Sequence, residues 1–131
     1  MYKYSFEKLE VWKLSKDLSI IIYSITKTFP KDEIFGLSQM RRSAISIPSN
    51  ISEGSSRTSK KDYARFIQIA YGSLMELLNQ LIISCEFNYI SSEEYSKLRS
   101  LIEEIGNKLT SLRRSIISQI PKSTIIQINK Q

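Results

Sequence analysis

The chain has 131 residues, a length that fits one domain built around one hydrophobic core. It carries 19 basic and 13 acidic side chains, which give a net charge of +6, and it has one cysteine and no histidine. A lone cysteine excludes an internal disulfide and a cysteine metal cluster. The absence of histidine removes the commonest general base and zinc ligand. We therefore expect a protein that is not an enzyme, with no catalytic residues, no bound metal and no cofactor.

The N-terminal stretch MYKYSFEKLEVWK lacks the apolar segment of a signal peptide. The longest apolar run, Ile20–Tyr23, is far too short to span a bilayer. These two features predict a cytoplasmic protein that makes no contact with a membrane.

The positive charge is unevenly distributed along the chain. Residues 36–70 hold six basic and two acidic side chains, a local charge of +4, whereas residues 71–100 have a charge of −2. The last 31 residues have a charge of +3. A basic face would attract nucleic acid or another polyanion. The alternative is that a modest excess of charge simply keeps a small protein soluble.

Apolar residues recur at spacings of three and four positions, which predicts helices. A first helix is expected over roughly 7–29, ending just before Pro30, because the residue before a proline avoids helical angles. A second is expected over 33–54. It begins with Glu33, whose carboxylate suits a helix N-terminus, and ends at Gly54, a common stop signal.

The third predicted helix, 60–89, starts with a capping sequence and carries two apolar stripes. A helix that is apolar on more than one face contacts several neighbours or another subunit. The fourth, 92–119, starts with the capping box at Ser91 and ends before Pro121, leaving a short tail at 121–131. Short connections between long helices predict an all-α fold, an antiparallel up-down-up-down four-helix bundle that forms a single domain over residues 1–131.

A row of small and amide side chains runs beside the apolar stripe of the second predicted helix. A solvated face would favour long charged residues, so we interpret the row as a buried or half-buried polar seam that fixes the register between helices or subunits. The predicted seam residues on the second helix are Gln39, Ser43, Ser46, Asn50 and Glu53, and those on the third are Ser73 and Glu76.

Pro48 lies inside the second predicted helix. A proline there removes one backbone donor and clashes with the preceding turn. We expect a bend near residues 44–48, with Ser43, Ser46 or a water molecule satisfying the carbonyl that the proline leaves free.

Several motifs, in this order and at these spacings, resemble the bacterial family of four-helix-bundle proteins encoded in intervening sequences of 23S rRNA genes. The accessory subunit of diversity-generating retroelements is a related bundle. The resemblance covers roughly residues 6–118. It is carried by FEKLEVW at 6–12, FP at 29–30, Glu33, FGL at 35–37, QMRRSA at 39–44, SIPSNISEG at 46–54, Arg57, Phe66 and IAYGSLMEL at 69–77.

The resemblance implies an antiparallel bundle that assembles with itself as a ring, a pentamer in the known cases. It also implies a basic surface and no established enzymatic activity. The retroelement relatives bind a reverse transcriptase and nucleic acid.

Two local patterns have a chemical and a structural interpretation. Glu53 and Glu76 could form a carboxylate pair for metal binding or acid–base chemistry, but bundle di-metal sites also use histidine. We favour a structural role, in which these carboxylates form hydrogen bonds or pair with Arg41. Gly54–Arg57 could form a phosphate cradle, but it lacks the P-loop pattern, and we favour a turn between helices. The adjoining helix start, beside Lys60, remains a possible anion site.

The densest basic residues are the candidate nucleic-acid-binding set. In an up-down bundle the end of the fourth helix lies near the end of the second and the start of the third. Arg113 and Arg114 should then share an end with Arg57, whereas Arg41 and Arg42 should lie nearer the other end and pair with glutamates. The full set is Arg57, Lys60, Lys61, Arg65, Arg113, Arg114, Arg41 and Arg42.

Aromatic residues on the first and third helices could stack on nucleic-acid bases, although aromatics at helical spacing more often form core or subunit contacts. They are Trp12, Tyr23, Phe29, Tyr63, Phe66 and Tyr71.

The leading hypothesis is an oligomer that binds RNA, DNA or a nucleoprotein through a basic surface. The alternative is a protein-interaction scaffold, such as an accessory subunit of a reverse transcriptase, with no nucleic-acid contact of its own.

Overall fold

The computed structural model describes residues 1–32 and 34–121, without the side chains of 34–36. The predicted Glu33 start and all but the first residue of the predicted tail lie outside the described residues. A short 3-10 helix precedes four long α-helices, and no strand occurs in the part described. The elements are η1 Ser5–Lys8, α1 Glu10–Thr26, α2 Ile34–Ser55, α3 Lys60–Glu86 and α4 Ser92–Ser118. The predicted all-α class is confirmed.

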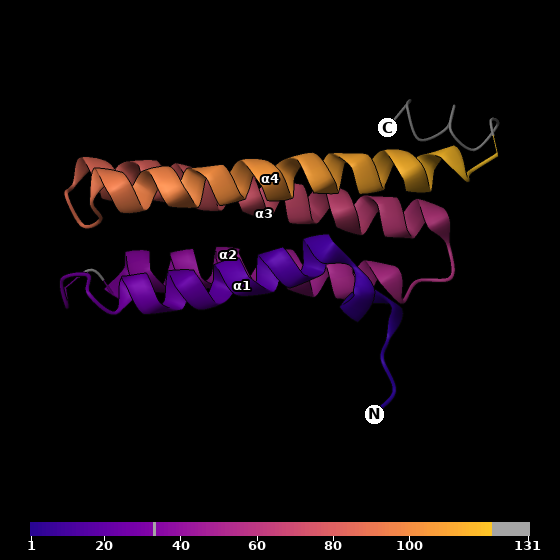
Figure 1. The fold of residues 1–131 in the computed structure, drawn as a ribbon, viewed down its shortest axis with the longest axis horizontal. Helices are drawn as coiled ribbons and strands as arrows, with labels where there is room; N and C mark the ends of the chain where they lie inside the picture. Colours follow the sequence, from indigo (N-terminus) through magenta and orange to yellow (C-terminus); the bar gives the residue numbers. More distant parts are fainter. Residues whose placement is uncertain (33, 122–131) are drawn as a thin grey trace.

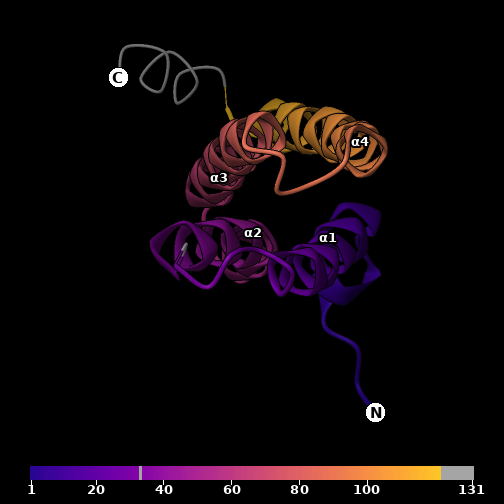
Figure 2. The ribbon, with the colours of Figure 1, turned by 90° about the vertical axis from the view of Figure 1, so that its left-hand side faces the viewer.

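The four α-helices lie side by side along the long axis of the molecule (Figure 1). The connections alternate between its two ends, with α1–α2 and α3–α4 at one end and α2–α3 at the other. Figure 2 shows two layers, α1 with α2 and α3 with α4. The helix α2 packs against α3, α3 against α4, and α1 against both α2 and α4. The end of α2, the start of α3 and the end of α4 therefore meet at one end of the bundle.

The core consists of the apolar stripes that the helices turn toward the bundle axis. Each fully buried Leu or Ile side chain stabilises the fold by about 1.5–3 kcal/mol relative to exposure. Fully buried members from the four helices are Leu18, Ile22, Ile47, Ile51, Ile67, Leu74, Leu77, Leu81, Ile102, Ile105 and Leu109.

Both predicted N-terminal caps are formed. The Ser59 hydroxyl accepts a hydrogen bond from the backbone N–H of Asp62 at 3.2 Å, and Ser91 and Glu94 form a complete capping box. These contacts satisfy backbone donors that have no partner within the first turn of a helix.

The first predicted helix is broken near its start. Leu9 has an extended backbone, with φ −75° and ψ 125°, and separates η1 from α1. The ring of Phe6 meets that of Trp12 edge to face at 5.1 Å, and η1 contacts both α1 and α2. The prediction of one helix over 7–29 is therefore wrong at both ends, because η1 turns to cover the bundle and α1 ends at Thr26.

The third helix ends at Glu86, three residues before the predicted end. Asn88 has a positive φ of 62°, a left-handed conformation that asparagine tolerates better than most residues. The N–H of Tyr89 donates to the carbonyl of Ser84 at 2.9 Å, and the N–H of Asn88 donates to the carbonyl of Cys85 at 3.0 Å. These two bonds form a Schellman motif that terminates α3.

The helix α2 ends at Ser55, one residue after the predicted end at Gly54, so Gly54 lies within the helix and has no positive φ. A Cβ atom at Gly54 would lie 2.7 Å from the Cβ of Phe66 and 3.1 Å from the Cδ1 of Tyr63. Both are on α3, and a Cβ–Cβ approach this short does not occur between real side chains. Glycine is required at position 54 because α2 and α3 approach so closely there.

Pro48 is buried inside α2, and its freed carbonyl is satisfied from another helix. The carbonyl of Ala44 accepts a hydrogen bond from the hydroxyl of Ser19 on α1 at 3.0 Å. The predicted donors are engaged elsewhere, since Ser43 bonds to the carbonyl of Gln39 and Ser46 bonds to α3. The expectation of a donor from within α2 is therefore wrong.

Among the described helices, α3 has the length and composition of a membrane span, with a mean hydropathy of 1.3 over 18 residues. It packs against both α2 and α4, as the core helix of a bundle does. Four apolar side chains of α3 lie on its outer surface and are at least 36% exposed. These are Ile69, Met75, Ile82 and Ile83. This outer surface is available to another macromolecule.

Candidate nucleic-acid interface

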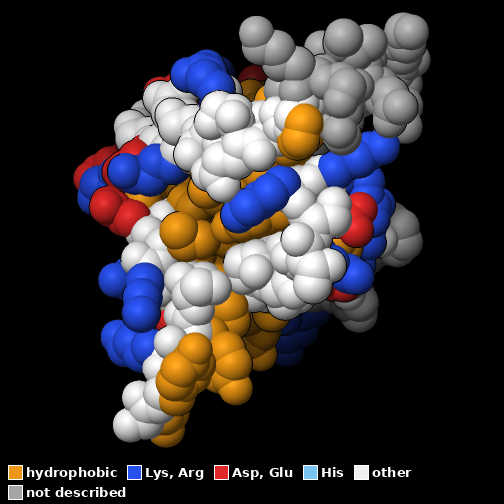
Figure 3. Space-filling model, turned by 90° about the vertical axis from the view of Figure 1, so that its right-hand side faces the viewer, with side chains coloured by type: hydrophobic (Ala, Val, Ile, Leu, Met, Phe, Trp, Pro, Cys, Tyr) orange, Lys and Arg blue, Asp and Glu red, His pale blue; other side chains and the backbone are white. Residues whose placement is uncertain are grey.

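The α2–α3 connection meets the end of α4 at one end of the bundle (Figure 1). Basic residues of the connection, of the start of α3 and of the end of α4 lie there. Figure 3 views this end and shows basic side chains between and around hydrophobic ones. The first group follows α2 or occupies the first two turns of α3, and the second lies in the last two turns of α4. Together they are Arg57, Lys60, Lys61, Arg65, Arg113 and Arg114, and we call them the basic end.

Two aromatic rings support the cations of α3 and the preceding turn. The guanidinium carbons of Arg57 and Arg65 lie 4.7 and 5.0 Å from the ring centre of Phe66, which is buried. The Lys60 ammonium lies 6.0 Å from the ring of Tyr63. Burial raises the pKa of the Tyr63 phenol above its ordinary value. Cation–π contacts of this kind position a charge without cancelling it.

Most cations of the basic end form no ion pair, although Asp62 lies among them in the first turn of α3. Arg57 forms an ion pair with Glu53 at 2.7 Å, and the other five cations form no ion pair with any described residue. A cluster of like charges raises the local electrostatic potential and attracts anions. The basic end is therefore available to a polyanion.

A groove between α3 and α4 opens beside Arg113 and Arg114. We call it the α3–α4 groove, and its volume is about 320 Å³. The Nε atom of Arg113 is shielded from solvent and has no hydrogen-bond partner in the described structure. The lining residues are Ile67, Gln68, Tyr71, Leu109, Thr110, Arg113, Arg114 and Ile117.

Arg41 and Arg42 do not join the basic end. The Nε of Arg41 donates to the Thr26 hydroxyl at 2.8 Å, and its guanidinium lies 4.2 Å from the ring centre of Tyr23. Arg42 lies 3.8 Å from the Glu76 carboxylate. The predicted pairing of Arg41 with Glu53 or Glu76 is wrong, because Glu53 pairs with Arg57, whereas Arg42 does contact a glutamate, Glu76. Both arginines hold α2 to its neighbours.

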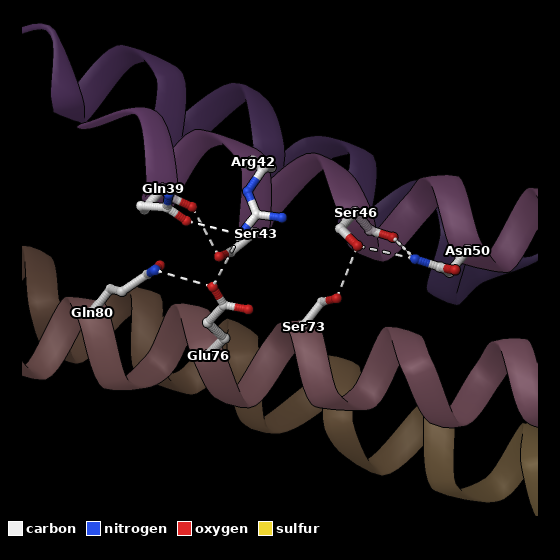
Figure 4. Close-up of polar contacts among 8 residues, drawn as sticks. All are labelled: Gln39, Arg42, Ser43, Ser46, Asn50, Ser73, Glu76 and Gln80. Carbon is white, nitrogen blue, oxygen red and sulfur yellow. Dashed lines mark hydrogen bonds and ion pairs between the residues drawn. The ribbon is translucent and has the colours of Figure 1, made fainter. Parts of the chain in front are cut away.

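The predicted polar seam lies along the contact between α2 and α3 (Figure 4). The hydroxyls of Ser46 and Ser73 are 2.9 Å apart, and the Asn50 amide donates to the Ser46 hydroxyl at 3.0 Å. One turn before Ser46 on α2, Arg42 bridges the side chains of Gln39 and Glu76. These contacts fix how α2 sits on α3.

Two predicted seam residues have other surroundings. Ser43 is buried but bonds within α2, to the carbonyl of Gln39. Glu53 is exposed and pairs with Arg57, so it does not meet Glu76. Among the described residues, no group of three or more His, Cys, Asp or Glu side chains could hold a metal ion. The carboxylate-pair interpretation of Glu53 and Glu76 is wrong.

Sequence reasoning missed the polar residues of the α3–α4 groove. Gln68 lies one turn before Tyr71, and Thr110 lies one turn before Arg113, so each shares a helix face with a candidate residue. That spacing was visible in the sequence. The register that brings the two faces together was not.

Four packed helices with cations gathered at one end define a small helical-bundle protein with a basic surface. The chain matches the model of the 23S rRNA-intervening sequence protein family over residues 7–111 and belongs to that family. The resemblance recognised in the sequence motifs is thereby confirmed.

A solved structure supports the same fold. It is the crystal structure of a protein with unknown function from the S23 ribosomal protein family, from Bacteroides thetaiotaomicron VPI-5482. The similarity has a TM-score of 0.73 and 25% sequence identity, and it covers 79% of this chain and 97% of the other. No curated protein matches the chain significantly.

Proposed function

We propose that the protein is a non-enzymatic, cytoplasmic, oligomeric bundle whose basic end binds the backbone of RNA or DNA, alone or in a nucleoprotein. One observation carries this proposal. Of six cations brought together from the α2–α3 connection, α3 and α4, five have no acidic partner among the described residues. Counterion release from the nucleic acid would supply most of the affinity.

Recognition at this end would depend on charge more than on sequence. The cations lie at helix ends and in a turn, and phosphate contacts of this kind position a protein without reading bases.

Two exposed apolar surfaces support self-assembly. One is the outer face of α3, which includes Ile69 and Ile83. The other is a groove between α1 and α2, where Ile20 and Ile45 are each 60% exposed and flank Tyr23. Two different surfaces on one subunit suit a head-to-tail contact, which closes into a ring when the rotation allows. We propose a homo-oligomer, a pentamer by analogy with the family, in which the basic ends repeat around one rim.

The same apolar surfaces favour a second candidate function, a scaffold that binds a partner protein such as a reverse transcriptase. The exposed side chains of Ile20 and Ile45 are the observation behind it. A partner that stays bound after nuclease treatment, together with no affinity for RNA or DNA, would support this candidate over the first.

The test is a binding titration of the purified protein against RNA and DNA at increasing salt. We expect binding at about 50 mM salt and an affinity that falls steeply and log-linearly as salt rises. Absence of binding at about 50 mM salt would reject the proposal, because phosphate-driven affinity is greatest under those conditions.

A further inference from the structure

The α3–α4 groove combines an apolar wall with two cations. Ile67 and Leu109 are buried at its floor, and the half-buried ring of Tyr71 lies beside them. Its volume of about 320 Å³ is at the lower end of the range for small-ligand sites. The groove therefore suits one flat, mostly apolar group of modest size.

The cations of the groove are free to bind an anion. Neither Arg113 nor Arg114 forms an ion pair with a described residue. The Nε of Arg113 is shielded from solvent and has no hydrogen-bond partner among the residues that the structure describes. Leaving a buried donor unpaired is unfavourable, so a ligand that draws the guanidinium into a hydrogen bond would be favoured.

We propose that the α3–α4 groove binds one unpaired nucleotide of a single strand, with the base against Tyr71 and the phosphate at Arg113 and Arg114. This inference rests on the proposed nucleic-acid binding and extends it to a preference between strand types. A base in a duplex is stacked and paired, so it cannot enter the groove without first leaving the helix. The polar side chains of Gln68 and Thr110 at the groove could contact the edge of the base.

The first experiment measures the anisotropy of a labelled RNA of about 20 nucleotides at about 50 mM salt, with the full chain. It compares the single strand, its duplex and a strand with abasic sites in place of bases. We expect the single strand to bind about fivefold or more tightly than either of the others, as one stacked base would give. Equal affinity for all three would overturn the proposal.

A matched pair of variants locates the effect. Thr110→Phe fills the α3–α4 groove. Ser111→Phe places the same side chain in the groove on the other side of α4, beside Leu9 and Lys108. We expect Thr110→Phe to reduce the single-strand preference to less than about twofold and Ser111→Phe to retain it. Circular dichroism and thermal melting verify that both variants are folded.

The outcomes separate this inference from the function on which it rests. Salt-dependent binding without any strand preference would overturn the groove proposal and leave backbone binding intact. Loss of the preference in both Phe variants would also overturn it, because the effect would not be specific to the groove. A free mononucleotide carries the same base and phosphate as one nucleotide of the strand. If an equal concentration of mononucleotide displaces the strand, the strand is not the preferred ligand of the groove.

Discussion

The hydroxyl of Ser19 on α1 donates to the carbonyl of Ala44 on α2 at 3.0 Å, and it shares its one hydrogen with the carbonyl of Ser15 at 3.1 Å. Pro48, four residues after Ala44, has no N–H to offer that carbonyl. A contact between two helices therefore replaces a bond within one helix, and it lets α2 run unbroken from Ile34 to Ser55. The proline and the serine should be energetically coupled.

A double-mutant cycle measures this coupling. Ser19→Ala leaves the buried Ala44 carbonyl without its donor and should destabilise the fold by about 1–3 kcal/mol in urea unfolding. In a Pro48→Ala background the backbone N–H is restored, so the same change should cost less than about 0.5 kcal/mol. Ser49→Ala, on the exposed face of α2, is the control. An equal cost of Ser19→Ala in both backgrounds would show that the two residues are independent.

The close approach of α2 and α3 at Gly54 gives a second prediction. Gly54→Ala places a Cβ atom 2.7 Å from that of Phe66, so the helices must move apart, and we expect a loss of about 1–3 kcal/mol in stability. Gly72→Ala on α3 is the matched control. Its Cβ meets nothing within 4 Å, and the higher helix propensity of alanine should stabilise the chain by up to about 1 kcal/mol. Denaturant midpoints that move in the same direction for both variants would refute this account of Gly54.

The end of α3 gives a third prediction. Asn88 has a φ of 62°, which strains any residue with a Cβ, asparagine less than alanine. Asn88→Ala should therefore lower the free energy of unfolding by about 1 kcal/mol, whereas Asn88→Gly should leave it unchanged or raise it. Thermal melting compares the two variants. If alanine is tolerated as well as glycine, the left-handed conformation does not determine where α3 ends.

Helix existence and caps were predictable from the sequence because they depend on local spacing. Apolar periodicity marked all four helices, and the Ser59 and Ser91 caps followed from residues within one turn. Contacts such as Ser19 with Ala44, or Arg41 with Thr26, were not predictable. They depend on how far each helix is rotated about its axis and on the register between helices, which periodicity does not determine.

The candidate site also has features that the sequence predicts and others that depend on how the helices pack. Alternating helix direction was enough to expect Arg113 near the start of α3. The sequence did not show that Arg57 and Arg65 share the ring of Phe66, because both contacts depend on side-chain directions at a turn. It also did not show the α3–α4 groove, whose shape depends on which faces the two helices present to each other.

Self-assembly gives a fourth prediction. Ile20→Glu combined with Ile45→Glu places two carboxylates on the apolar α1–α2 groove and should disrupt an oligomer that buries it. Light scattering should show a multimer for the wild type and a smaller species for the variant, with helix content unchanged in circular dichroism. Ser49→Glu, an exposed change outside the groove, should leave the multimer intact. A monomeric wild type at micromolar concentration would contradict the proposed assembly.

The most direct test of the central claim, that the basic end carries nucleic-acid binding, compares two charge-matched double variants. Lys60→Gln with Lys61→Gln removes two charges from the basic end, whereas Lys27→Gln with Lys31→Gln removes two near the α1–α2 connection at the opposite end. The measurement is the slope of log affinity against log salt. We predict that the first pair lowers the magnitude of the slope by about 2, one for each lost phosphate contact, and that the second leaves it unchanged. Equal weakening by both pairs would contradict the account, because affinity would then follow net charge and not the basic end.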